Sequence, residues 1–528
     1  MPLTYKKTNR RENQRMNKLL HCLLCTATAG SLLLAASAAA FPVYAEDETD
    51  DKNTFTDEMM TYEKISGGVK ITAVNPSATI INIPEIIDSY PILGIADDAF
   101  AGCASMTELK ISAKIKEIGS GAFNGCSALT ELKLPDTLTS IGDGAFAKCS
   151  GLKELILPDS VTEIGKYAFS YCTSLTHVTL SKNIKTLPSY AFYYDIELNE
   201  LDIPEGIETI SSMSMVGCYS LPKLDIPASV KTIEPLSMLS CSSLKEVSVS
   251  PDSESFRTDE NGVLFSADGK QLILYPAGIE AESYTVADSV LQIQPYAFSG
   301  AIALKDVHVP NGIAAIGDGA FAGCASLQSF DFPASLNQIP ASMFIDCASL
   351  TSFTIPDTVI MIGDSAFMNC TALQSISIPD SVTAVAPYAF CGCTAIPEIT
   401  VPETVTQVGD YAFGFQEDTE NKDAEAPIPI EGFVLKCQAN SAAKDYAAQA
   451  GIKYRQSGFD RNILISAGII LLAIAVIAVV ILITKKKKTA APAASENKPE
   501  KITDPNYIGI LADSDSITED KDDEQHAE

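Results

Sequence analysis

The chain has 528 residues and a formal net charge of -30, because 67 acidic side chains outnumber 37 basic ones. Hydrophobic residues make up 46% of it and charged residues 20%, which excludes a wholly disordered chain and a polytopic membrane protein. Such an acidic protein repels phosphate backbones, so nucleic acid is excluded as a partner. Four histidines and no tryptophan leave little material for metal or general-base chemistry.

The first 45 residues predict a secretory signal peptide. Basic residues precede an apolar run at residues 19–40, and Ala45 closes a cleavage site of small residues. The alternative for this segment is an uncleaved membrane anchor. Residues 46–61 are acidic and are predicted to form a linker.

A repeat of 23 residues occupies most of the chain. Its marker is an aromatic residue, usually after alanine, which methionine replaces twice. The gap of 60 between Met238 and Phe298 equals one repeat plus an insertion of 37 residues. Aligned on the marker, a unit reads AFxxCxxLxxLxLPxxLxxIGxx. The markers are Phe100, Phe123, Phe146, Phe169, Phe192, Met215, Met238, Phe298, Phe321, Phe344, Phe367, Phe390 and Phe413.

Each unit predicts one rung of a solenoid. The L-x-L stretch alternates as a strand with one buried face, and proline ends the strand because it has no N–H for the ladder. A unit of 23 residues cannot enclose a core alone, so units must stack with parallel strands and equivalent apolar residues in contact. An aspartate such as Asp143 or Asp318 begins the segment before Ala-Phe, and we expect a short helical or 3-10 turn there on the convex side.

This unit resembles the BspA-like leucine-rich repeat over roughly residues 62–456. The resemblance implies a leucine-rich repeat solenoid, a right-handed coil of parallel β-strands with a 23-residue period. It also implies a surface protein that adheres to host or matrix proteins, or to other cells. We predict an N-terminal cap at residues 62–102, repeats at 103–431 and a C-terminal cap at 432–456, which cover the apolar ends of the solenoid.

Residues 250–283 form an island inside the repeats. Asp268-Gly269 lies between two apolar stretches, which predicts a β-hairpin. We expect the island to stand out from the solenoid, where it either contacts a ligand or packs locally.

An uncharged stretch at residues 463–484 predicts one transmembrane helix. Its 22 residues are long enough to span a hydrocarbon layer of about 30 Å. Four lysines follow at residues 485–488 and place that side in the cytoplasm. The prediction is a single-pass plasma-membrane protein, on a bacterial cell surface, with its repeats outside the cell and a disordered cytoplasmic tail at 485–528.

Ten of the 14 cysteines lie three residues after the marker. A disulfide or metal framework is one interpretation, but the paired ligand spacing of a zinc site is missing. Parallel in-register side chains point the same way, so we expect a column of small buried thiols. Cys391 and Cys437 lie off this column and are either paired or free.

The exposed strand positions are the candidate binding site. Residues eight and ten after the marker should face outward on the concave side, and few of them are aromatic. No catalytic motif or cofactor site is recognised, so we expect neither an enzyme nor a bound cofactor. The candidate protein-binding residues are Glu108, Lys110, Glu131, Lys133, Glu154, His177, Thr179, Glu200, Asp202, Lys223, Asp225, Asp306, His308, Ser329 and Asp331.

These features predict an adhesion protein whose strand face binds an extracellular protein of a host, a matrix or a neighbouring cell. Two alternatives remain open. The solenoid could be a structural spacer of the envelope without a specific ligand, or a receptor whose short tail recruits a cytoplasmic partner.

Overall fold

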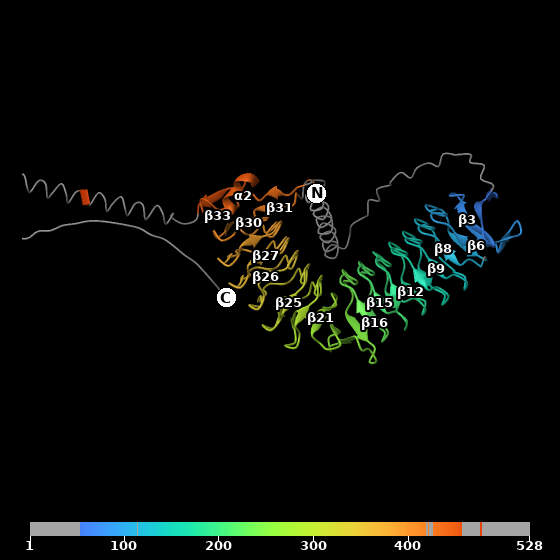
Figure 1. Cartoon of the computed structure of the whole chain (residues 1–528), viewed down its shortest axis with the longest axis horizontal. Coiled ribbons are helices and arrows are strands. Elements are labelled where there is room, and N and C mark those ends of the chain that lie inside the picture. Colours follow the sequence, from blue (N-terminus) through green and yellow to red (C-terminus); the bar gives the residue numbers. More distant parts are fainter. Residues whose placement is uncertain (1–52, 113, 419–420, 422–425, 457–475, 478–528) are drawn as a thin grey trace, which may run out of the picture. The chain divides into compact units, whose positions relative to one another are not determined.

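The computed structural model describes residues 53–112, 114–418, 421, 426–456 and 476–477. The predicted signal peptide, nearly all of the predicted transmembrane helix and the predicted tail lie outside these residues. Among the residues that are described, no helix is long and apolar enough to cross a membrane. The described residues between 53 and 456 form a series of stacked rungs, with the strands of neighbouring rungs side by side (Figure 1).

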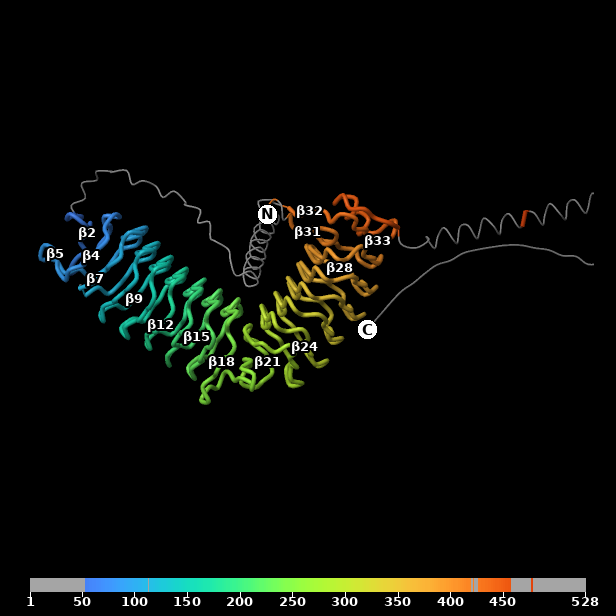
Figure 2. Tube along the Cα trace, turned by 180° about the vertical axis from the view of Figure 1, so that it is seen from behind, coloured from blue at the N-terminus to red at the C-terminus, as the bar shows by residue number. Residues whose placement is uncertain are grey.

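Figure 2 shows the rungs side by side from the N-terminal cap to the C-terminal cap. Short parallel strands at two positions of the rungs make two ladders, each divided into several sheets. The first ladder holds the L-x-L stretches: β4 (Ile80–Ile83), β7 (Glu108–Ile111), β10 (Glu154–Ile156), β12 (His177–Thr179), β14 (Glu200–Asp202), β16 (Lys223–Ile226), β18 (Glu246–Val249), β22 (Ser283–Thr285), β24 (Asp306–His308), β29 (Glu398–Thr400), β33 (Val434–Cys437) and β34 (Tyr454–Gln456). The second ladder holds β6 (Tyr90–Ile95), β8 (Glu117–Ile118), β9 (Ser140–Ile141), β11 (Glu163–Ile164), β13 (Thr186–Leu187), β15 (Thr209–Ile210), β17 (Thr232–Ile233), β21 (Gln271–Leu274), β23 (Gln292–Ile293), β25 (Ala315–Ile316), β26 (Gln338–Ile339), β27 (Met361–Ile362), β28 (Ala384–Val385) and β30 (Gln407–Val408).

The 23-residue period is the register of the ladders. In the first ladder His177 pairs with Glu200, and in the second ladder Thr209 pairs with Thr232. Equivalent apolar side chains therefore stack on one another. The marker rings are buried, and the neighbouring stacked pairs have centroids 4.7 to 5.9 Å apart, as in Phe100–Phe123 and Phe321–Phe344.

The expected helical turn before Ala-Phe is wrong. The segment is a run of turns in which residues such as Gly121 and Gly144 have positive φ angles of 62° and 60°. In this conformation backbone N–H and C=O groups point along the axis of the stack, toward the neighbouring rungs. The N–H of Phe123 therefore donates to the carbonyl of Ala145 in the next rung at 2.7 Å. Asp143 caps no helix, because its Oδ1 accepts from the N–H of Lys166 in the next rung at 2.7 Å. The turns thus make a third ladder, which we call the turn ladder.

The marker-linked cysteines are buried thiols, as expected of a filled column. Nine of them donate Sγ to the carbonyl of a marker residue 26 positions earlier, at 3.1 to 3.3 Å, as Cys347 does to Phe321. Burial raises the pKa of these thiols, so they are poor nucleophiles and poor candidates for oxidation. Cys391 and Cys437 are buried as well.

The island does not stand out from the solenoid. Its strand β19 (Phe256–Thr258) pairs with β20 (Leu264–Ser266) in an antiparallel arrangement. β20 in turn pairs with β21, also antiparallel, which confirms the hairpin at Asp268-Gly269. Val263, Leu264 and Leu272 are fully buried in the core. Burial of apolar surface therefore holds the hairpin inside the stack.

The insertion is also shorter than the gap between markers indicates. Tyr275 stacks on Phe298 with ring centroids 5.1 Å apart, and its N–H donates to Ala297, as a marker residue does. Because Tyr275 lies 23 residues before Phe298, the chain from Met238 to Tyr275 is one rung of 37 residues instead of 23. The island is thus one rung lengthened by 14 residues.

Both caps have the predicted strands. The N-terminal cap pairs β2 (Met60–Ile65) with β3 (Gly68–Val74), and β5 (Ile86–Ile87) with β6. It also includes β1 (Thr54–Thr56), which falls in the segment expected as a linker. In the C-terminal cap, α2 (Ala442–Ala450) lies between β33 and β34, after a short hairpin of β31 (Phe415–Gln416) and β32 (Ile428–Pro429). The Tyr446 hydroxyl accepts from the N–H of Phe413, where the turn ladder ends.

Candidate functional surface

The predicted strand-face residues lie on the first ladder or in phase with it. All 15 are exposed or half-buried, and they flank buried residues such as Leu109 and Val178. Residues 131–133 and 329–331 keep the phase of the repeat but are not assigned to strands. The alternation of buried and exposed residues agrees with the sequence pattern, whereas the assignment of this face to the concave side stays a prediction.

Half of the carboxylates on this face are paired within the chain. The face carries eight carboxylates and three lysines among the predicted residues, so it is acidic. An exposed pair adds only about 0–1 kcal/mol to stability, but a ligand that needs one of these charges must compete with its neighbour. The pairs are Glu108–Lys110 at 2.7 Å, Asp225–Lys223 at 3.1 Å, Asp306–His308 at 2.9 Å and Glu200–His177 at 3.0 Å.

The remaining predicted residues are dispersed along the face. His177 Nε2 lies 3.0 Å from the hydroxyl of Thr179, which brings these two together with Glu200. Within its described residues the structure gives no ion pair to Glu131, Lys133, Glu154, Asp202 or Asp331. The face therefore offers spaced charges and hydroxyls without a compact centre.

A compact aromatic group lies on the turn ladder instead. We call it the tyrosine cluster, and it consists of Tyr167, Tyr171, Tyr190, Tyr193, Tyr194 and Tyr219. Its rings form one continuous chain of contacts across neighbouring rungs. The centroid distances are 4.3 Å for Tyr167–Tyr190, 5.4 Å for Tyr190–Tyr193, 5.5 Å for Tyr171–Tyr193, 5.6 Å for Tyr171–Tyr194 and 6.0 Å for Tyr194–Tyr219.

The period of the repeat places these rings together. Tyr167 and Tyr190 lie two residues before their markers, and Tyr171 and Tyr194 lie two residues after them. These four tyrosines have φ between 58° and 62°, a conformation that glycine adopts at the same position in other rungs, such as Gly121. Stacking between rungs is a compensating contact for tyrosine in this conformation.

The cluster is accessible and uncharged. Tyr167 is 42% exposed, Tyr193 is buried, and the other four rings are half-buried. Burial raises the pKa of Tyr171 and Tyr193, so their hydroxyls stay protonated at physiological pH. The surface thus combines apolar ring area with neutral hydroxyl groups that can donate or accept hydrogen bonds.

Sequence reasoning missed this cluster because it examined aromatic residues only on the strand face. The signal was present as two columns of tyrosine, two residues on either side of the marker. Among the residues that the structure describes, no group of three or more histidine, cysteine, aspartate or glutamate side chains could hold a metal ion.

A family model for the BspA-type leucine-rich repeat region matches this chain in several overlapping segments, over residues 93–260 and 277–424. These residues are more than half of the 528. The chain belongs to the BspA-type leucine-rich repeat family. The match leaves out residues 261–276, which belong to the lengthened rung and its hairpin.

Solved structures agree with this assignment. A leucine-rich cell surface protein from Faecalibacterium prausnitzii is 28% identical, with a TM-score of 0.53, and the alignment covers 68% of this chain and 95% of that one. The pneumococcal vaccine antigen PcpA is 22% identical, with a TM-score of 0.51, over 77% of this chain and 99% of that one, and shows the same fold. No curated protein sequence matches the chain.

Proposed function

We propose that this BspA-type protein is a non-catalytic adhesion protein of a bacterial cell surface, and that the tyrosine cluster is the centre of its contact with an extracellular protein. The family and the Faecalibacterium cell surface protein support the location. So does the predicted signal peptide, which would export the repeats. The membrane helix predicted at residues 463–484 would hold them at the surface.

The observation that carries the proposal is the set of six tyrosines in mutual contact on an accessible turn face. Tyrosine is enriched among the few residues that supply most of the affinity of a protein interface. Rings that are already stacked lose little side-chain entropy when a partner covers them, because their rotamers are fixed beforehand.

The strand face has a secondary role in this proposal. Its excess of carboxylates would attract a basic partner and raise the association rate. The intrachain ion pairs that satisfy Glu108, Asp225 and Asp306 reduce what each charge adds to affinity. We therefore expect charge substitutions on this face to change salt dependence more than affinity.

The test compares adhesion of cells that display the full-length chain to cultured epithelial cells and to immobilised matrix proteins. The cluster variant is Tyr167→Ser, Tyr190→Ser and Tyr219→Ser together. Serine already occupies the left-handed position of Tyr167 and Tyr190 in other rungs, at Ser342 and Ser365. It also occupies the position of Tyr219, four residues after the marker, at Ser127 and Ser150, so the fold should persist. We expect about a thousandfold weaker adhesion, because the loss of two interface anchors of about 2 kcal/mol each removes about 4 kcal/mol, and each 1.4 kcal/mol is a factor of about ten.

A matched control exists elsewhere in the chain. Tyr388 and Tyr411 also lie two residues before their markers, and their rings are in contact with centroids 5.3 Å apart, but they lie outside the cluster. Tyr388→Ser with Tyr411→Ser should leave adhesion unchanged. Equal loss in both variants would refute the cluster as the binding surface. Recognition would lie on the strand face if adhesion is lost only when four of its residues are replaced together, namely Glu131, Lys133, Glu200 and Asp202. If the native chain shows no saturable adhesion, the result favours a structural spacer.

A further inference from the structure

The lengthened rung interrupts the backbone ladders. In the second ladder β17 pairs with β15 on one side, whereas β21 pairs with β20 and β23 and not with β17. The described residues also separate into two hydrophobic clusters that meet at this rung. The second ladder is also unpaired between β11 and β13 and between β25 and β26. The lengthened rung differs from those two places because the turn ladder, described next, is interrupted there as well.

The turn ladder is broken at the same place. In the described rungs from Phe100 to Phe390, the N–H of each marker residue donates to a carbonyl of the next rung, apart from Met238. At the C-terminal end the Tyr446 hydroxyl takes over this role for Phe413. Within the described residues the N–H groups of Met238 and Ser240 have no hydrogen-bond acceptor, although both residues are at least nine-tenths buried.

The edge of β17 completes this set of unused backbone groups. In an intact rung the carbonyls of Lys116 and Ile118 accept from the next rung. The equivalent carbonyls of Lys231 and Ile233 accept no hydrogen bond from any residue that the structure describes. One side of the break therefore presents two acceptors and two donors, and the repeat geometry directs all four toward the following rung.

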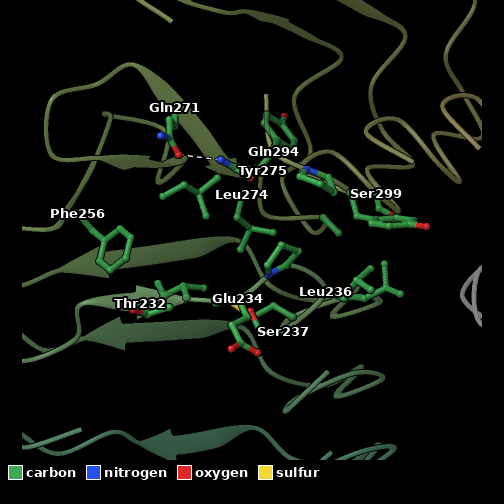
Figure 3. A pocket seen from close by; sticks show the side chains of 18 of the residues that line it. Thr232, Glu234, Leu236, Ser237, Phe256, Gln271, Leu274, Tyr275, Gln294 and Ser299 are labelled. Carbon is green, nitrogen blue, oxygen red and sulfur yellow. Dashed lines mark hydrogen bonds between the residues drawn. The ribbon is translucent and has the colours of Figure 1, made fainter. Parts of the chain in front are cut away.

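A cavity of about 220 Å³ lies in this direction. Thr232, Glu234 and Ser237 line it from one rung, and Leu274 and Gln294 from the rungs that follow. Figure 3 shows these two groups on opposite sides of the cavity, with Gln294 donating to Gln271 at 2.7 Å. The cavity is partly open to solvent.

Its side chains add further unused polar groups. Tyr275 and Ser299 also line the cavity, and their residues are only 1% and 7% exposed. Neither hydroxyl has a hydrogen-bond partner among the residues that the structure describes, and the same is true of the buried hydroxyl of Ser240 beside Met238. Buried polar groups without partners each cost about 1–3 kcal/mol, and their concentration at one break indicates a site for an external ligand.

We propose that this cavity binds a short extended peptide segment of a partner protein, which completes the interrupted ladders by β-strand addition. The carbonyls of the segment would accept from Met238 and Ser240, and its N–H groups would donate to Lys231 and Ile233. The volume lies below the roughly 300–1,000 Å³ of pockets for drug-sized ligands, so a few residues with small side chains would fit. This proposal does not depend on the tyrosine cluster.

The test is hydrogen exchange by mass spectrometry on the full-length protein in nonionic detergent. The probe is a pool of acetylated tetrapeptide amides built from glycine, alanine, serine and valine. In the free protein, segment 236–241 should exchange at least about tenfold faster than segment 213–218, where Met215 and Gly217 donate to the next rung. The pool should slow exchange in the first segment alone, and N-methylated peptides should not.

Ser299→Leu is the discriminating variant, because it fills the cavity, and large apolar residues such as Val216 and Leu239 occupy the same position in other rungs. It should abolish the effect of the peptides, whereas Ser170→Leu in an intact rung should not. If no peptide slows exchange at millimolar concentration, or if Ser299→Leu responds like the native chain, the proposal is overturned. Equal protection of both segments in the free protein would overturn it as well.

Discussion

Removal of one marker ring should destabilise the stack strongly. Phe146 is fully buried, and its ring lies 5.1 Å from that of Phe123 and 5.6 Å from that of Phe169, both nearly parallel to it. Phe146→Ala leaves a cavity in a rung that cannot collapse without moving both neighbours. A buried Phe→Ala change costs about 3–5 kcal/mol. The loss of two ring contacts, each worth about 0.5–1.5 kcal/mol, places the expected value near the top of this range.

Phe146→Met is the matched control. Met215 and Met238 fill the marker position in two native rungs, so methionine should cost less than about 1.5 kcal/mol. Urea unfolding of the full-length protein, followed by circular dichroism and tyrosine fluorescence, measures both, since the chain has no tryptophan. If the alanine and methionine variants unfold within about 0.5 kcal/mol of each other, the stacked rings do not hold the rungs together.

Two further substitutions test the packing between rungs. Asp195 replaces cysteine in the thiol column, and burial raises the pKa of its carboxyl well above the usual value. The folded state therefore holds a proton that the unfolded state releases above about pH 4, so stability falls as the pH rises above that value. Asp195→Cys should raise the melting temperature more at pH 7 than at pH 4, and an equal rise at both pH values would contradict a protonated carboxyl. Gly142→Ala places a methyl group 2.5 Å from the backbone nitrogen of Ser120 in the preceding rung. The substitution should lower the free energy of unfolding, measured in urea, by about 1–3 kcal/mol. An unchanged free energy of unfolding would mean that the rungs can separate locally.

The architecture was predictable because the sequence repeats its chemistry at a fixed interval. A period of 23 sets the register of every ladder, as the pairing of His177 with Glu200 shows. The C-terminal cap was predictable for a different reason, since strand, helix and strand are distinct local patterns there, and Ser441 caps α2 by accepting from Lys444.

The turn segment could not be assigned from residue type alone. Aspartate before Ala-Phe is typical of a helix start, but the carboxylate of Asp143 instead accepts a hydrogen bond from an N–H of the next rung. The choice depends on contacts between rungs, which local propensity does not contain. Tyr275 was missed as a marker for a related reason. It is not preceded by alanine, and no cysteine lies three residues after it. Only its stacking on Phe298 shows that it fills the marker position.

The candidate surface was predicted only in part. Alternation within each strand is a local property, so the exposure of residues such as Glu131 and Glu200 followed from sequence. The tyrosine cluster forms between residues about 23 positions apart in turns whose left-handed backbone was not foreseen. Its rings converge only because that backbone directs side chains of neighbouring rungs toward one another.

Site-specific photo-crosslinking tests the central claim most directly. A benzophenone amino acid would replace Tyr190 in the cluster, Glu200 on the strand face or Tyr388 outside both, in full-length protein displayed on cells. Exposure to the adhesion target should give a saturable covalent adduct with an extracellular protein at position 190 and none at position 388. Adducts at position 200 alone, or equal adducts at all three positions, would contradict recognition by the tyrosine cluster.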